Sequence, residues 1–123
     1  MGKWVILIGD SNNTIARYEN MIFSGSKKIN KTAHYIDIFY ENDYARYAQF
    51  LDDDDKHIIG DYDPAELEKL PFGNVKMIML KYSDIDILKK IVSSDDFPKD
   101  IIIDCDGVDP GLENIIDRKR LLI

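Results

Sequence analysis

The feature that most constrains this fold is a set of short apolar runs, each about as long as a β-strand. The first, Lys3–Ile8 (KWVILI), is nearly continuous, as expected for a central strand that is buried on both faces. Similar runs follow at residues 75–82 (VKMIMLKY) and 100–105 (DIIIDC). The first run is far too short to span a bilayer, which takes about 20 residues. We therefore expect a sheet and no membrane segment.

The middle of the chain predicts an antiparallel meander. Residues 33–40 (AHYIDIFY) alternate as a strand, with Ile36 and Ile38 on one face and Tyr35 on the other. Residues 44–51 (YARYAQFL) are interpreted as a hairpin strand, with a short helix as the alternative. Two further segments are expected to be a solvated loop (SGSKKINK, residues 24–31) and a short strand (KHIIGDY, residues 56–62).

The clearest helix signal lies at residues 63–70 (DPAELEKL). Asp63 is placed to cap the helix, Pro64 occupies its first position, and Glu66 completes a capping box. Asn12 and Asn13 are expected to cap a second helix, at residues 14–22. Further helices are expected at residues 83–94 and at the start of residues 109–123.

Together these segments predict one α/β (or α+β) domain over residues 1–123. Its mixed sheet has five or six strands, with a central antiparallel meander, and three or four helices cover it. The strand, helix and strand within residues 75–105 predict a right-handed parallel crossover. The lone Cys105 forms no disulfide within the chain and no signal peptide precedes Gly9, so we expect a cytoplasmic protein.

The formal net charge of −7 is concentrated in one region. Residues 41–63 contain eight acidic residues and two basic ones. Such a chain is repelled by phosphate backbones, which argues against nucleic-acid binding and favours a basic partner. An overlapping segment, residues 35–62, is rich in aromatic residues, a composition typical of protein interfaces. It holds seven of the chain's thirteen aromatic residues: Tyr35, Phe39, Tyr40, Tyr44, Tyr47, Phe50 and Tyr62.

Two motifs at strand ends suggest chemistry. The segment DCDGV resembles the first motif of haloacid dehalogenase-like phosphatases, with Asp104 as nucleophile and Asp106 as acid. Only seventeen residues follow Asp106, too few for the large domain of that family. A turn with Gly107 at its tip is therefore the preferred interpretation.

The segment ILIGDSNN resembles the nucleophile block of GDSL-type esterases, with Ser11 as nucleophile. A serine needs a base, and the family takes it from an Asp-x-x-His near the C-terminus, where this chain has no histidine. The two histidines, His34 and His57, have no metal-ligand spacing. We therefore predict no catalytic residue, metal or cofactor. The alternative is a small hydrolase or ligand-binding domain that uses Asp10, Ser11, Asp104 and Asp106.

The small size, the acidity and the tract DYDPAELEKLPFGNVKMIMLKYSDIDILKKIVSSDDFPKDIIIDCDG resemble bacterial immunity proteins of polymorphic and contact-dependent inhibition systems. The resemblance implies that the protein is not an enzyme but blocks a cognate toxin domain, often a basic nuclease. Acidic side chains would mimic phosphates and aromatic ones would anchor the contact. The expected contact residues are Glu41, Asp43, Tyr44, Tyr47, Phe50, Asp52, Asp53, Asp54, Asp55 and Asp61. Homo-oligomerisation through the aromatic residues is a third hypothesis.

Overall fold

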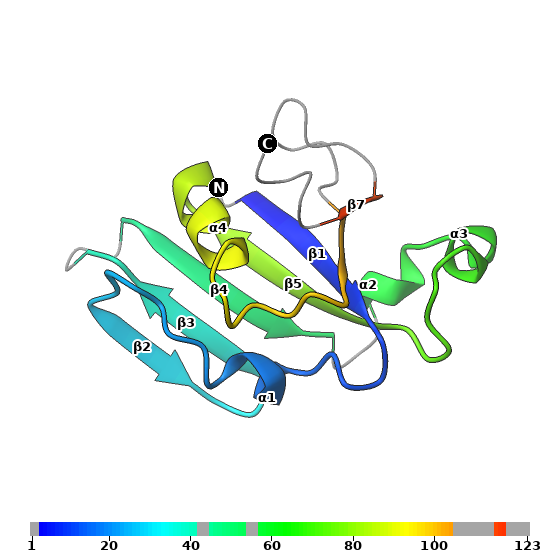
Figure 1. The fold of residues 1–123 in the computed structure, drawn as a ribbon, viewed down its shortest axis with the longest axis horizontal. Coiled ribbons are helices and arrows are strands. Elements are labelled where there is room, and N and C mark those ends of the chain that lie inside the picture. Colours follow the sequence, from blue (N-terminus) through cyan, green and yellow to red (C-terminus); the bar gives the residue numbers. More distant parts are fainter. Residues whose placement is uncertain (1–2, 42–44, 54–56, 105–114, 118–123) are drawn as a thin grey trace.

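The computed structural model describes residues 3–41, 45–53, 57–104 and 115–117, which form a seven-stranded sheet and four helices (Figure 1). The strands are β1 (Lys3–Gly9), β2 (Lys28–Lys31), β3 (Tyr35–Phe39), β4 (Tyr47–Asp52), β5 (Lys76–Tyr82), β6 (Ile102–Asp104) and β7 (Ile115–Asp117). The helices are α1 (Ile15–Tyr18), α2 (His57–Gly60), α3 (Pro64–Glu68) and α4 (Ile85–Val92). None of the described helices is long and apolar enough to cross a membrane.

The strand order is β2-β3-β4-β5-β1-β6-β7, and every neighbouring pair is antiparallel. The α/β class and the central antiparallel meander are confirmed. The sheet was expected to be mixed, with five or six strands, but it has seven strands and its neighbours pair antiparallel throughout. The expected parallel crossover joins strands of the same direction, β5 and β6, but β1 lies between them and is antiparallel to both. The crossover through α4 therefore joins two strands that are not neighbours.

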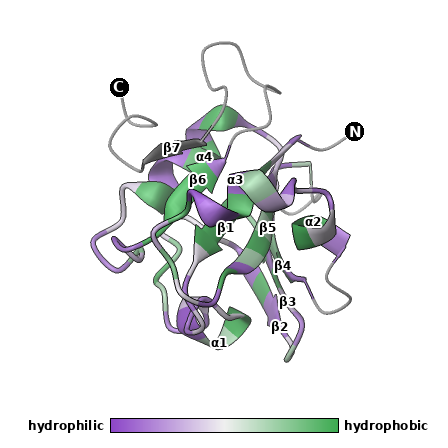
Figure 2. Ribbon diagram, turned by 90° about the vertical axis from the view of Figure 1, so that its right-hand side faces the viewer, coloured by the Kyte–Doolittle hydropathy of each residue, from purple (hydrophilic) through white to green (hydrophobic). Residues whose placement is uncertain are grey.

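Side chains of alternate residues divide the sheet into two faces. The core face carries the larger hydrophobic cluster, including Val5, Leu7, Ile38, Phe50 and Leu80, and packs against α1 and α4. The outer face carries a smaller cluster under α2 and α3, which includes Ile6, Ile8 and Met77. Figure 2 shows α2 on the opposite side of the sheet from α4. The chain therefore builds two layers of helices over a single sheet.

A buried asparagine joins the ends of two central strands. The Asn13 amide nitrogen donates to the carbonyls of Leu7 and Lys76, both at 2.9 Å, and its oxygen accepts from the Tyr18 hydroxyl at 2.5 Å. Burial raises the pKa of Tyr18. A Cβ on Gly9 would lie 2.8 Å from the Asn13 Cβ, so only glycine permits this approach. Asn13 thus makes tertiary contacts within the sheet.

The helix expected at residues 14–22 is shorter than predicted. Its N-cap is Thr14, which makes no side-chain capping bond, so the capping role expected for Asn12 and Asn13 is wrong. The helix ends at Tyr18, and Ile22, expected on its apolar side, is 76% exposed. The tertiary bonds of Asn13 occupy the side chain that was expected to cap.

Three other segments also differ from expectation. Residues 28–31 form the edge strand β2, whose exposed lysines are a common protection against edge-to-edge pairing. Residues 57–60 form α2 instead of a strand, and residues 115–117 form β7 within the segment expected to begin as a helix. The strand choice for β4 and the capping box of α3 are confirmed.

Candidate functional site

The strand-end residues do not converge on one site. In the antiparallel pair of β1 and β6, Asp104 lies opposite Ile6, whereas Asp10 and Ser11 follow the far end of β1. Antiparallel strands place their carboxyl ends at opposite edges of a sheet, so the predicted grouping of Asp10, Ser11 and Asp104 is wrong. Asp106, the fourth residue of that alternative, lies outside the described residues.

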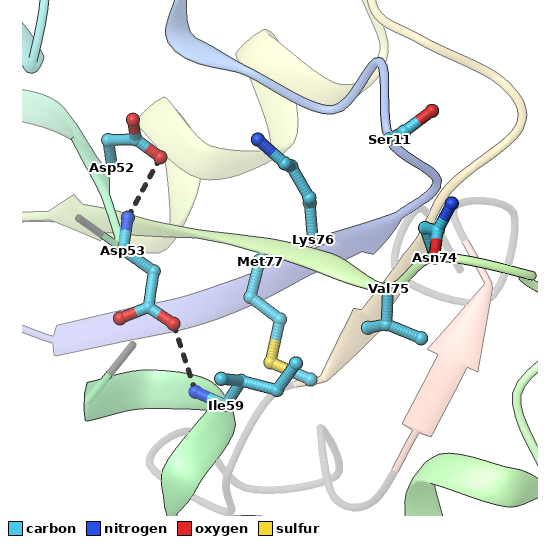
Figure 3. Close-up of a pocket in the computed structure, with 8 residues that line it drawn as sticks. All are labelled: Ser11, Asp52, Asp53, Ile59, Asn74, Val75, Lys76 and Met77. Atoms are coloured by element: carbon cyan, nitrogen blue, oxygen red, sulfur yellow. Dashed lines mark hydrogen bonds between the residues drawn. The ribbon is translucent and has the colours of Figure 1, made fainter. Parts of the chain in front are cut away.

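Ser11 and Asp104 instead line separate pockets. A cavity of about 540 Å³ contains Ser11 with Asp52, Asp53 and Lys76, and the Ser11 hydroxyl points away from the two aspartates (Figure 3). Asp104 accepts a hydrogen bond from the Tyr62 hydroxyl and lines a second cavity. Within the described residues, no group of three His, Cys, Asp or Glu side chains is placed to hold a metal ion.

Asp53 holds the start of α2. One carboxylate oxygen accepts a hydrogen bond from the backbone N–H of Ile58, at 2.9 Å. The other accepts from the N–H of Ile59, at 3.0 Å (Figure 3). These N–H groups lie in the first turn, where a helix has no internal partners for them. Asp53 therefore has a structural role that its place in the acidic run did not reveal.

The acidic residues that were expected to contact a partner, where the structure describes them, do not lie together. Arg46 directly precedes β4, and its guanidinium lies 3.8 Å from the Glu41 carboxylate. The same guanidinium forms an ion pair with Asp84 at 3.0 Å. Asp52 lies at the other end of β4, roughly 17 Å away at the usual rise per strand residue. Asp61 is exposed just beyond α2. A single acidic patch is therefore not formed by these residues, and Asp43, Tyr44, Asp54 and Asp55 lie outside the described part of the chain.

Phe50 is not a surface residue. Its side chain is fully buried on the core face, and its ring stacks on Tyr18 with 4.9 Å between the centroids. The prediction that Phe50 contacts a partner is wrong. Its neighbours on the same strand show why: Ala48 is also buried, whereas Tyr47, Gln49 and Leu51 are partly exposed on the other face.

The outer face carries a continuous surface over β3 and β4, which we call the outer patch. It consists of Tyr35, Asp37, Phe39, Tyr47, Gln49 and Leu51, all partly exposed. Tyr35 pairs with Leu51 and Phe39 with Tyr47 across the two strands. The Gln49 amide donates to Asp37 at 2.6 Å, which fixes the polar centre of the patch.

The helices on this side of the sheet lie elsewhere. In Figure 1, α2 and α3 lie on the right, beyond β3 and β4, and α2 packs on β5. Among the described elements, none covers the outer patch. Tyr47 was expected to contact a partner, but Tyr35 and Phe39 were not, although the strand alternation already placed both on the face away from Ile36 and Ile38.

Comparisons with protein-family models, with curated proteins and with solved structures each returned no match.

Proposed function

We propose that this protein binds and neutralises a cognate protein toxin domain, and that the outer patch is its contact surface. The observation that carries the proposal is the partly exposed aromatic surface of Tyr35, Phe39 and Tyr47, which no described helix covers. Tyrosine combines a large apolar ring with a polar tip and is enriched at protein interfaces. The resemblance to immunity proteins supplies the class of partner.

The composition of the patch suits a specific contact. The rings of Tyr35 and Tyr47 lie at opposite ends of the patch, and the Asp37–Gln49 pair lies between them. A rigid sheet holds these groups in place, so little conformational entropy is lost when a partner orders them. An arrangement of aromatic contacts around a fixed polar centre favours one partner over many.

Electrostatics favours a basic partner. The chain has a net charge of −7, and acidic residues flank both ends of β4. Glu41 and Asp84, which share Arg46, leave an excess acidic charge at one end, and Asp52 lies at the other. Lys28 and Lys81 border the patch itself, opposite Phe39 and Gln49. The flanking acids would therefore act mainly on the encounter rate, while the aromatic residues set the lifetime of the complex.

The test is protection of bacterial growth. On this proposal the gene immediately upstream encodes a large secreted toxin, and co-expression of this protein should rescue cells that produce its toxic domain. Replacing both Tyr35→Thr and Tyr47→Thr should remove most of the protection, because threonine keeps the strand propensity but removes the rings.

The matched control is Ile22→Thr, which removes an exposed apolar side chain elsewhere on the surface. This variant should protect as well as the wild type. Full protection by a folded Tyr35→Thr/Tyr47→Thr variant would contradict the outer patch as the contact surface, and an upstream gene with no toxic product would contradict the assigned class.

A further inference from the structure

A pocket of about 460 Å³ adjoins the outer patch on the same face of the sheet. We call it the Trp4 pocket; its lining residues are Trp4, Ile6, His57, Ile58, Asp61, Tyr62, Glu66, Met79 and Asp104. Met79 of its floor pairs with Leu51 of the outer patch, so the two surfaces are continuous. A partner seated on the outer patch therefore lies beside the mouth of this pocket.

The walls of the pocket combine aromatic rings with carboxylates. Trp4 and Tyr62 supply the rings, and Asp61, Glu66 and Asp104 supply three acidic side chains. The lining residues include one histidine, His57, and no lysine or arginine. Rings attract cations through their faces, tryptophan most strongly, and carboxylates add directional hydrogen-bond acceptors.

We propose that the Trp4 pocket accepts an arginine side chain of the partner toxin. The inference rests on the proposed function and names the chemistry that this part of the contact recognises. A planar guanidinium stacks on an aromatic face and bonds carboxylates through paired N–H groups, which suits these walls better than the compact ammonium of lysine. The pocket is large enough for the whole side chain, whose apolar stem would lie along Ile58 and Met79.

One cationic neighbour opposes this occupant, because Lys81 lies opposite Trp4 in the β1–β5 pair, on the same face. The three carboxylates of the lining outnumber it, so the local balance still favours a cation. Lys81→Gln should consequently strengthen arginine binding slightly.

The single tryptophan of the chain provides the readout, because its indole N–H gives one isolated NMR signal from inside the pocket. The probe is the peptide acetyl-Gly-Arg-Gly-amide, titrated into the full-length protein at low salt. The expected result is a saturable shift of the Trp4 signal. The matching lysine peptide should shift it less, and the citrulline peptide, which has the same shape without the charge, should leave it unchanged.

Removing charge from the wall should weaken the binding. Glu66→Gln keeps a side-chain acceptor for the α3 capping box, so the helix should persist. Together with Asp61→Asn, it should weaken arginine-peptide binding about two- to fivefold for each carboxylate, as expected of partly exposed ion pairs. Glu68→Gln, an exposed acid on the same helix outside the pocket, is the matched control and should leave the affinity unchanged.

The outcomes separate this inference from the proposed function. Equal shifts from the arginine and citrulline peptides, or no saturable shift, would overturn the pocket assignment, even if the outer patch protects cells. Arginine binding to the pocket without any protection from the toxin would contradict the proposed function and leave the pocket's chemistry established.

Discussion

The two faces of β3 and β4 are built from the same strands but serve different ends. On the core face, Ile38 and Phe50 are completely buried within the main hydrophobic cluster. One residue further along each strand, Phe39 and Leu51 remain partly exposed on the outer face. Both faces carry large apolar side chains, so residue type alone does not tell them apart. The difference lies in what covers them.

Coverage follows from the connections between strands. The segments that contain α1 and α4 return across the core face, whereas the link from β4 to β5 forms α2 and α3 beside the outer face, where their cluster lies on β5 and β1. The outer patch is therefore left uncovered by the described helices (Figure 1). Side chains on the core face should determine stability, and those in the outer patch should determine binding.

The largest expected effect is on the core face. Phe50→Ala should lower the free energy of unfolding by about 3–5 kcal/mol, because it removes a fully buried ring and leaves a cavity beside Tyr18. Tyr47→Ala, three residues earlier in the strand, should cost no more than about 1 kcal/mol. Urea unfolding of both variants tests the comparison, and equal losses would show that the two faces do not differ in this way.

A second variant tests the buried hydrogen bonds that Asn13 makes near the end of β1. Asn13→Ala should cost about 1–3 kcal/mol, since it leaves the buried carbonyl of Leu7 without its amide donor and the Tyr18 hydroxyl without its acceptor. Asn12→Ala, an exposed neighbour, is the control and should change stability by less than about 0.5 kcal/mol. If thermal unfolding shows the same midpoint for both variants, the buried bonds of Asn13 contribute nothing.

A smaller effect is expected where the outer face is covered. Asp53→Ala should lower stability by about 1 kcal/mol, the usual cost of losing a helix cap. It should also speed hydrogen exchange at the N–H groups of Ile58 and Ile59, because these groups donate their hydrogen bonds to the Asp53 carboxylate. Asp61→Ala removes the same charge from an exposed position and should do neither. Similar exchange in both variants would mean that Asp53 acts only through its charge.

Much of the fold was predictable because local patterns and tertiary packing agree. The run Lys3–Ile8 predicted a central strand, and β1 is paired on both sides. The segment of α2 was mispredicted because its helix depends on Asp53, a cap that lies outside the segment. The position of β6 could not be predicted from local patterns either. Whether β6 pairs with β1 or with β5 depends on how the whole sheet is arranged.

The candidate site was only partly predictable. Tyr47 was selected correctly as a partly exposed residue, but Phe50 was assigned to the same surface. Residues three apart in a strand point to opposite faces, so the strand assignment already separated these two side chains. The acidic run gave no comparable signal, because charge density does not show that Asp53 already bonds two backbone N–H groups.

The most direct test of the central claim is an NMR footprint of the ¹⁵N-labelled protein on addition of the toxin domain that, on the proposed function, the neighbouring gene encodes. The account predicts that the largest shifts fall on Tyr35, Asp37, Phe39, Tyr47, Gln49 and Leu51, with smaller changes at Trp4. Shifts confined to α1 and α4, over the core face, would contradict it.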